Sequence, residues 1–259
     1  MTPSVGALSG RRVIVTRPAG QAASLCSTLA ERGAEVLALP AIEIQPVANG
    51  EAAQAALAAI APEDWVIFVS RNAVEQALAL WPLPRWPAGL RTAAVGKGTA
   101  AALAACGLGV SWVPDAGFDS EALLALPAFA HPVGQRVWIV RGVGGRALLG
   151  QTLAERGARV EFIEVYRRAC PEQCLPDTVF SDPPPLILIS SPEALDNLLA
   201  LCRSDAQREG LLNSELIVIN ERTAQRARRL GFTRPPRLAG GPDDAAFLDA
   251  LLQGEPHER

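Results

Sequence analysis

The chain contains two copies of one sequence pattern. The six residues LAERGA occupy Leu29–Ala34 and recur at Leu153–Ala158, an offset of 124 residues. At the same offset, further matches run without a gap from Val13 to Val36. Self-similarity at a fixed offset indicates one supersecondary unit that is used twice, and two copies are too few for a solenoid. The repeat therefore predicts two similar lobes, with a space between them in which a ligand could bind.

The repeat continues towards the C-terminus with a small change of offset. Ile67–Leu78 matches Leu186–Leu199, and Ala94–Gly107 then matches Val218–Gly231 at the original offset. The order of the matches is the same in both copies, so each copy is a whole folding pattern rather than one duplicated helix.

Length and composition agree with two lobes and exclude several classes of protein. The chain has 259 residues, enough for two domains of ordinary size. Its formal net charge of −3 provides no basic field for nucleic acid. No apolar run is long enough to cross a membrane, and the N-terminus shows no signal peptide. We therefore expect a cytoplasmic, monomeric protein without nucleic acid or membrane partners.

The cysteines and histidines do not form a metal-binding pattern. The five cysteines are scattered, and the closest pair, Cys170 and Cys174, lacks the two-residue gap of common zinc sites. The two histidines are His131 and His257. We expect reduced thiols, no metal site and no organic cofactor.

Short, continuously apolar runs alternate with helical patterns, which predicts buried parallel strands covered by helices on both faces. The class is α/β, with two doubly wound, flavodoxin-like lobes. Glycines at the ends of the helical patterns suit left-handed C-caps, and Ser191 before Pro192 suits an N-cap. The expected strands are 13–16, 66–69, 93–95, 137–140, 186–189 and 216–219. The expected helices are 21–32, 73–80, 99–105, 145–156, 192–202 and 223–230.

Hydroxyl and basic residues gather where these strands end. In doubly wound folds the ligand lies at the carboxyl ends of the strands. Helix N-termini open at the same edge and attract anions. Each residue by itself could equally be a helix cap or a solvated charge, but together they favour an anionic ligand. The candidate binding residues are Arg17, Ser70, Arg71, Lys97, Thr99, Arg141, Arg146, Ser191 and Thr223.

Seven short motifs follow one another along nearly the whole chain: VTRP (15–18), FVSRNAV (68–74), AVGKGTA (94–100), RGVGGR (141–146), EVYRR (164–168), ISSPEAL (189–195) and RTA (222–224). Together they resemble the motifs of uroporphyrinogen-III synthases. The sequence departs from the family pattern in two places. Asn220 stands where a glycine is expected, and Val69 and Arg71 flank Ser70 where threonine and often proline are expected. Asparagine tolerates the left-handed backbone, so the first departure does not remove the turn.

The resemblance implies a topology that the repeat alone would misread. In the family the chain crosses between lobes after its first β-α unit and returns later. The first lobe would then comprise residues 1–38 and 169–259, and the second lobe residues 45–162. Residues 39–44 and 163–168 would form a two-stranded linker, and the substrate cleft would lie between the lobes.

The resemblance also implies an activity. Such an enzyme is a lyase that closes hydroxymethylbilane, a linear tetrapyrrole with eight carboxylates, into uroporphyrinogen III with inversion of the terminal ring and loss of water. The family has a tyrosine at the position of Tyr166, the single tyrosine of this chain, and we expect it to assist departure of the hydroxyl group. A structural role for its ring remains an alternative. The preceding bilane-forming enzyme is an expected transient partner. The alternative function is a two-lobed tetrapyrrole-binding or sensor protein without catalysis.

Overall fold

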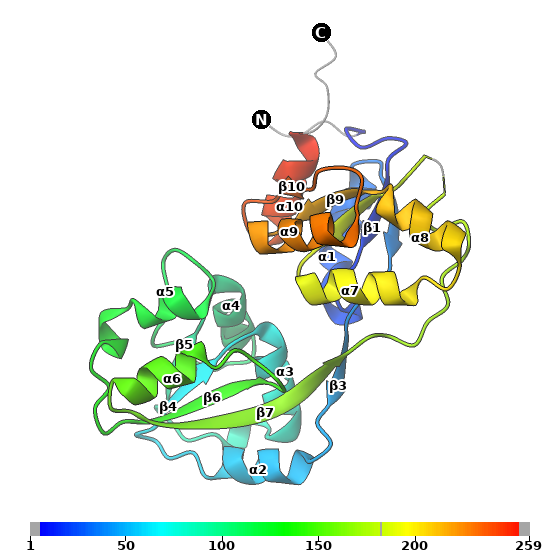
Figure 1. Cartoon of the computed structure of the whole chain (residues 1–259). Helices are drawn as coiled ribbons and strands as arrows, with labels where there is room; N and C mark the ends of the chain where they lie inside the picture. Colours follow the sequence, from blue (N-terminus) through cyan, green and yellow to red (C-terminus); the bar gives the residue numbers. More distant parts are fainter. Residues whose placement is uncertain (1–5, 182, 254–259) are drawn as a thin grey trace. The chain divides into compact units, whose positions relative to one another are not determined.

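The computed structural model describes residues 6–181 and 183–253. The chain divides into two compact units (Figure 1). The first contains the residues up to Glu43 and those from Ala169 onward, and the second is Ile44–Arg168. Each unit is described separately below.

The sheet of the first unit has the strand order β10-β9-β8-β1-β2. The four pairings between these neighbours are all parallel. Numbered along the unit, this order is 2-1-3-4-5, which is the flavodoxin-like order, so the predicted doubly wound α/β fold is confirmed for this unit. The strands are β1 (Arg12–Val15), β2 (Glu35–Ala38), β8 (Leu186–Ile189), β9 (Glu215–Val218) and β10 (Arg237–Leu238).

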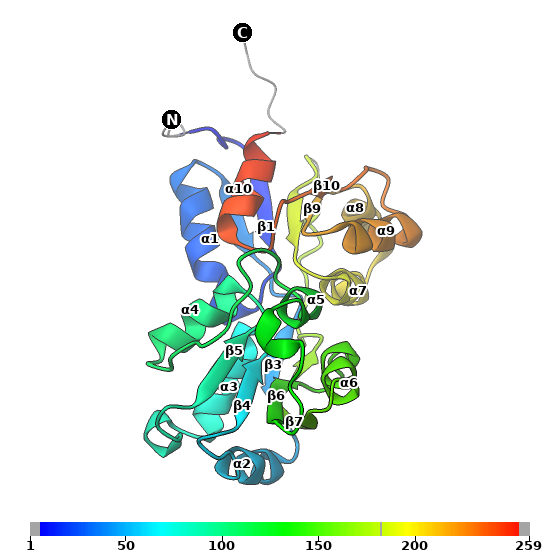
Figure 2. The same cartoon turned by 90° about the vertical axis from the view of Figure 1, so that its left-hand side faces the viewer.

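Helices cover this sheet on both sides. Leu25 and Leu29 of α1 and Phe247 of α10 pack with Val13 and Val15 of β1 in one buried core. Figure 2 shows α1 and α10 on one side of β1 and β9, with α7 and α9 on the other. This cover explains why the strand sequences are continuously apolar. The helices are α1 (Ala19–Glu31), α7 (Pro192–Leu201), α8 (Asp205–Leu212), α9 (Glu221–Leu230) and α10 (Asp244–Leu252).

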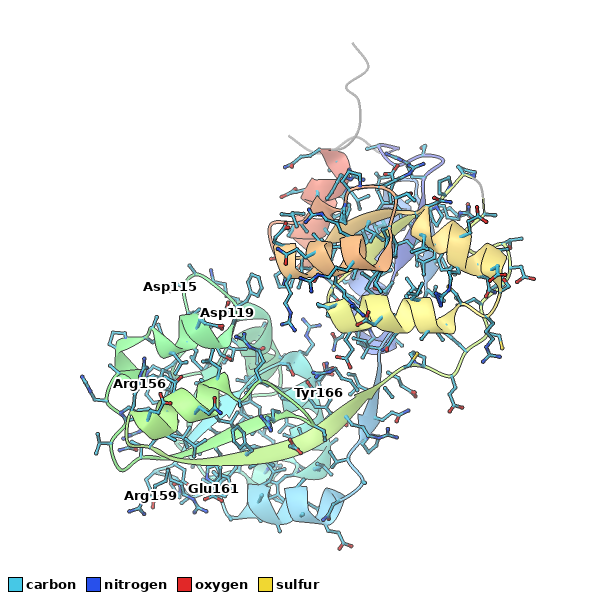
Figure 3. The ribbon with its side chains drawn as sticks, viewed as in Figure 1. Asp115, Asp119, Arg156, Arg159, Glu161 and Tyr166 are labelled. Carbon is cyan, nitrogen blue, oxygen red and sulfur yellow. The ribbon has the colours of Figure 1, made fainter. Side chains whose placement is uncertain are left out.

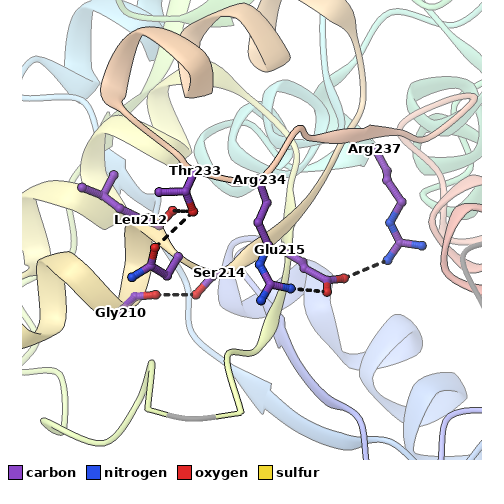
Figure 4. Close-up of polar contacts among 8 residues, drawn as sticks. Gly210, Leu212, Ser214, Glu215, Thr233, Arg234 and Arg237 are labelled. Atoms are coloured by element: carbon purple, nitrogen blue, oxygen red, sulfur yellow. Dashed lines mark hydrogen bonds and ion pairs between the residues drawn. The ribbon is translucent and has the colours of Figure 1, made fainter.

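Ion pairs hold the amino end of β9, at the edge of the sheet opposite to the carboxyl ends of the strands. Glu215 accepts a hydrogen bond from Arg234 at 2.6 Å and pairs with Arg237 at 3.6 Å (Figure 4). The Ser214 hydroxyl donates to the Gly210 carbonyl oxygen at 2.9 Å. These contacts tie α8, β9 and the segment before β10 together.

The sheet of the second unit has the order β3-β7-β6-β4-β5. β4 pairs in parallel with β5 and β6, and β6 pairs in parallel with β7. Beyond β5, Trp112 forms one parallel bridge with Ala93. The strands are β3 (Glu43–Pro46), β4 (Trp65–Phe68), β5 (Arg91–Ala94), β6 (Arg136–Gly142) and β7 (Arg159–Ala169).

Two cores flank this second sheet. One contains apolar residues of α2, α3 and α4, and the other contains residues of α5 and α6. The helices are α2 (Gly50–Ala58), α3 (Arg71–Leu80), α4 (Lys97–Ala105), α5 (Ser120–Leu124) and α6 (Leu148–Glu155), with short 3₁₀ turns at Leu83–Arg85 and Pro127–Phe129.

Each sheet joins the front of one sequence repeat to the back of the other. β1 and β2 come from the first repeat and share a sheet with β8, β9 and β10 of the second. β6 and β7 open the second repeat and share a sheet with β4 and β5 of the first. The chain therefore passes from one unit to the other twice, at Glu43 and at Ala169.

The structure confirms the predicted strands to within a few residues and corrects one helix. Helix α6 begins at Leu148, not at residue 145, because Gly144 has a positive φ of 72° and the Gly145 carbonyl oxygen binds the Arg141 side chain. The predicted glycine C-caps are confirmed: Gly33, Gly107, Gly157 and Gly231 all have positive φ.

In the described part of the chain no helix is long and apolar enough to cross a membrane. The same residues contain no group of three or more potential metal ligands. All five cysteines are free, and His257 lies outside the described residues.

Candidate functional site

The carboxyl edge of the second sheet brings together several predicted site residues. Ser70 and Arg71 follow β4, Lys97 follows β5, and Arg141 lies near the end of β6. Tyr166 lies late in β7, where Figure 3 labels it. Because parallel strands end at one edge, residues far apart in sequence meet there.

Tyr166 is almost completely buried. Its side chain is 2% exposed and packs in the core that α2, α3 and α4 cover. Its hydroxyl oxygen lies 3.1 Å from Ser70 Oγ, and either group can donate this hydrogen bond. The predicted catalytic tyrosine therefore contacts a predicted binding serine directly, and a substrate needs a local rearrangement to reach its hydroxyl group.

Ser70 and Ser191 occupy equivalent positions in the two repeats, and both are N-caps. The Ala73 N–H donates to Ser70 Oγ at 3.1 Å, and the Ala194 N–H donates to Ser191 Oγ at 3.1 Å. Both serines are partly exposed. Extended backbone at each serine turns the chain from strand to helix, so the hydroxyl stays at the helix N-terminus.

Thr99 and Thr223 do not cap helices. The N-caps are Gly96 and Asn220, three residues earlier. Asn220 Oδ1 accepts hydrogen bonds from the Thr223 N–H at 3.0 Å and from the Thr223 hydroxyl at 2.9 Å. Thr223 is fully buried and Thr99 is 7% exposed. At these two turns the main-chain N–H groups are therefore better placed for an anion than the threonine hydroxyls.

Two of the five predicted cations have no partner among the residues that the structure describes. Arg71 and Lys97 are exposed in the first turns of α3 and α4. Neither first turn contains an acidic residue. These two cations and the helix N-termini therefore make the edge of the second unit locally positive.

The other three predicted cations are engaged. Arg17 binds Asp244 and donates to the Pro242 carbonyl oxygen at 2.6 Å. Arg141 pairs with Glu164 at 3.0 Å, and its guanidinium lies 4.0 Å from the centre of the Phe162 ring. These contacts explain the presence of both arginines without a ligand.

Arg146 forms an exposed ion pair with Glu121. The hydrogen bond from Arg146 is the main cause that lowers the pKa of the Glu121 carboxyl group. The same bond raises the pKa of Arg146. A bound carboxylate would have to compete with Glu121 for this guanidinium.

The first turns at the edge of the first unit are more acidic. α7 carries Glu193, α9 carries Glu221 and α10 carries Asp244 in the first turn. Arg222, also in the first turn of α9, is exposed and has no partner within the described residues. Of the corresponding helices of the second unit, α3 and α4 have no acidic residue in the first turn and α5 has Glu121. The two units thus present edges of different charge.

A cavity of about 490 Å³ lies elsewhere in the second unit and contains none of the predicted site residues. Apolar residues of α2, Val143 and Phe162 form much of its wall. The full lining is Val47, Ala48, Asn49, Ala52, Ala53, Ala56, Val143, Phe162, Ile163 and Glu164.

Gly142, at the end of β6, is a residue of this edge that the sequence patterns do not single out. A Cβ atom added to this glycine would lie 2.7 Å from Cε2 and Cζ of Tyr166. The glycine belongs to the RGVGGR motif, but a glycine after a strand more often marks an ordinary turn. Only the structure shows that an aromatic ring lies against it.

Comparison with known proteins identifies the family. The family model described as uroporphyrinogen-III synthase HemD matches residues 23–237. A uroporphyrinogen-III synthase of Salmonella typhimurium is 34% identical over 249 residues, which cover 92% of this chain and 99% of the relative. The Escherichia coli uroporphyrinogen-III synthase is 32% identical over 244 residues, with the same coverage of both chains.

Solved structures agree in fold. Uroporphyrinogen-III synthetase of Helicobacter pylori matches with a TM-score of 0.61 at 17% identity, covering 95% of this chain and 100% of that one. A mutant uroporphyrinogen III synthase of Thermus thermophilus matches with a TM-score of 0.59 at 19% identity, covering 94% and 100%. The structures support the fold, and the family model and the sequence relatives show that the chain belongs to the uroporphyrinogen-III synthase family.

Proposed function

We propose that this protein is a uroporphyrinogen-III synthase, a lyase that closes hydroxymethylbilane into uroporphyrinogen III. The observation that carries this proposal is the match to curated synthases along 92% of this chain and 99% of the relative. The free cations and helix N-termini at the strand ends suit a substrate with eight carboxylates.

The reaction requires control of conformation more than strong chemical activation. The hydroxyl group leaves the terminal hydroxymethyl carbon as hydroxide, takes up a proton to become water, and leaves an electrophilic azafulvene. The far terminal ring then attacks through its substituted carbon, and the resulting spiro intermediate fragments and recloses with that ring inverted. Without an enzyme, the bilane closes directly to the symmetric isomer I. Holding the chain ends for the disfavoured attack is therefore the protein's main contribution.

Tyr166 is our candidate for the group that assists the leaving hydroxyl. Its hydroxyl can donate a hydrogen bond to the departing oxygen, while Ser70 holds it at the N-terminus of α3. In this role the local rearrangement that exposes Tyr166 accompanies substrate binding. The azafulvene can also form unaided, so Tyr166 is expected to accelerate the reaction without being indispensable.

The remaining candidates would hold the acetate and propionate groups. Arg71 and Lys97 are proposed as direct charge partners, because none of the residues that the structure describes pairs with them. Ser70, Ser191 and the main-chain N–H groups near Thr99 and Thr223 are proposed as hydrogen-bond donors at helix N-termini. Arg17, Arg141 and Arg146 would contribute only if a substrate carboxylate displaced their present partners.

We also propose that the protein is monomeric and cytoplasmic. It would make a short-lived contact with the enzyme that forms the bilane. The bilane closes to isomer I without enzyme, so rapid transfer between the two enzymes would preserve it.

The test is separation of the isomers formed from freshly generated bilane. The protein should raise the fraction of isomer III far above the spontaneous background, with a metal chelator present. Heat-denatured protein at the same concentration provides the background. An unchanged isomer ratio at high protein concentration would contradict the proposed activity. If the protein then still bound the product, the alternative function of a tetrapyrrole-binding protein would be favoured.

A further inference from the structure

The pairing of β6 with β7 changes register immediately before Tyr166. The pairing is regular from Arg136 opposite Arg159 to Arg141 opposite Glu164. The next pair joins Gly142 to Tyr166, so Val165 is an extra residue on β7. Such an irregularity can redirect the side chain that follows it.

Because of the register shift, the Tyr166 side chain points into a core that it would otherwise face away from. Successive side chains of a strand point to opposite faces. Ile163 and Val165 pack in the core beneath α2, α3 and α4. A regular strand would direct Tyr166 to the other face, yet Tyr166 packs in this same core and is 2% exposed. The extra residue therefore brings the Tyr166 ring to the side on which Ser70 lies.

Gly142 provides the space for the redirected ring. An added Cβ atom would lie 2.7 Å from Cε2 and Cζ of Tyr166 and 3.1 Å from its hydroxyl oxygen. Gly142 is not among the glycines with positive φ. Its backbone would accept alanine, so the close approach of the ring is the reason for glycine at this position.

The other repeat shows that the fold itself does not need this arrangement. At the repeat offset, Pro18 corresponds to Gly142 and Ile42 to Tyr166. Ser191, the counterpart of Ser70, caps its helix in the same way without a tyrosine partner. The glycine and tyrosine are therefore a special feature of the second unit, added to a strand-helix turn that forms without them.

We infer that Gly142 is a positioning residue for the reaction. Because it has no Cβ atom, the Tyr166 ring can pack against it with the tyrosine hydroxyl next to Ser70, at the N-terminus of α3. The inference rests on the proposed function, in which Tyr166 assists the leaving hydroxyl group. Gly142 itself touches no reacting atom and acts through the orientation of the tyrosine.

Tyr166 is the single tyrosine of the chain, so tyrosine labelled with ¹³C at Cζ gives one NMR resonance that reports on its hydroxyl group. Gly142→Ala and Ser70→Ala should each shift this resonance. Gly150→Ala is the matched control, because an added Cβ there would meet another aromatic ring of β7, that of Phe162, at 2.4 Å. The control should leave the tyrosine resonance in its wild-type position.

Kinetic measurements then test whether the orientation of the Tyr166 ring affects the reaction. In Gly142→Ala, kcat for isomer III should fall as far as in Tyr166→Phe, roughly tenfold or more, while KM stays near the wild-type value. Adding Gly142→Ala to Tyr166→Phe should cause little further loss, since both changes remove the same interaction.

The outcomes separate the two proposals. A wild-type protein that makes no excess of isomer III refutes the proposed function, while the NMR comparison still tests how Tyr166 is seated. Gly142→Ala with an unshifted resonance, or with a shifted resonance and wild-type kcat, overturns the inference, as does full activity of Tyr166→Phe. If Gly142→Ala does not fold, Ser70→Ala decides: an unmoved tyrosine resonance there also overturns it.

Discussion

Asp64 provides a sharp test of how the second unit is stabilised. This carboxylate lies just before β4 and is 4% exposed. Its Oδ2 accepts hydrogen bonds from the indole N–H of Trp138 at 2.7 Å and from the Ala61 N–H at 2.9 Å. Trp138 is 2% exposed, and its indole N–H donates to this carboxylate.

The structure sets the expected size of the effect. Asp64→Ala leaves the Trp138 indole N–H buried without an acceptor, which costs about 1–3 kcal/mol, and removes a charge-assisted hydrogen bond. We expect a loss of about 2–3 kcal/mol in the free energy of unfolding of the second unit. At ordinary urea dependence, this lowers the unfolding midpoint by about 1–2 M. Asp64→Asn keeps an acceptor oxygen and should lose only about 1 kcal/mol.

Tryptophan fluorescence measures this unit by itself, because all five tryptophans lie between Ile44 and Arg168. Urea unfolding of wild type, Asp64→Asn and Asp64→Ala should give midpoints in that descending order. Asp64 precedes β4 whereas Ser70 follows it, so kcat for isomer III without urea should be unchanged. A midpoint for Asp64→Ala equal to that of wild type would refute the reasoning, and so would Asp64→Asn being the less stable variant.

Three further predictions concern charge. Arg71→Gln and Lys97→Gln should each raise KM for the bilane, roughly two- to fivefold, because these cations have no partner in the described protein. Arg17→Gln should mainly destabilise the first unit, since Arg17 binds Asp244. Steady-state kinetics with separated isomers and urea unfolding measure both effects, and a larger KM change for Arg17→Gln would reverse the assignment. The lowered pKa of Glu121 implies a small stabilisation by its pair with Arg146 that is present above the unfolded pKa and disappears as pH falls through the folded pKa. Urea midpoints of wild type and Glu121→Gln should therefore differ at neutral pH and converge in acid; a difference that grows in acid would contradict this.

The sequence determined the architecture because local patterns and the internal repeat carry that information. Continuous apolar runs such as Leu186–Ile189 identify strands that are buried on both faces. Gly157 and Gly231 mark helix ends, because few other residues accept a positive φ. The hydroxyl and basic residues after the strands were also identifiable, since parallel strands all end at one edge.

The role of each side chain at that edge was decided only by tertiary structure. Arg17 and Arg71 look alike in sequence, yet Arg17 meets Asp244, 227 residues later, and Arg71 meets no partner in the described chain. Tyr166 would face the opposite side of the sheet if β7 were regular, and the register shift beside Gly142 directs it to Ser70. Partners so distant in sequence leave no local signal. A contact at the edge of a sheet depends on register and ring packing, which the folded chain sets as a whole.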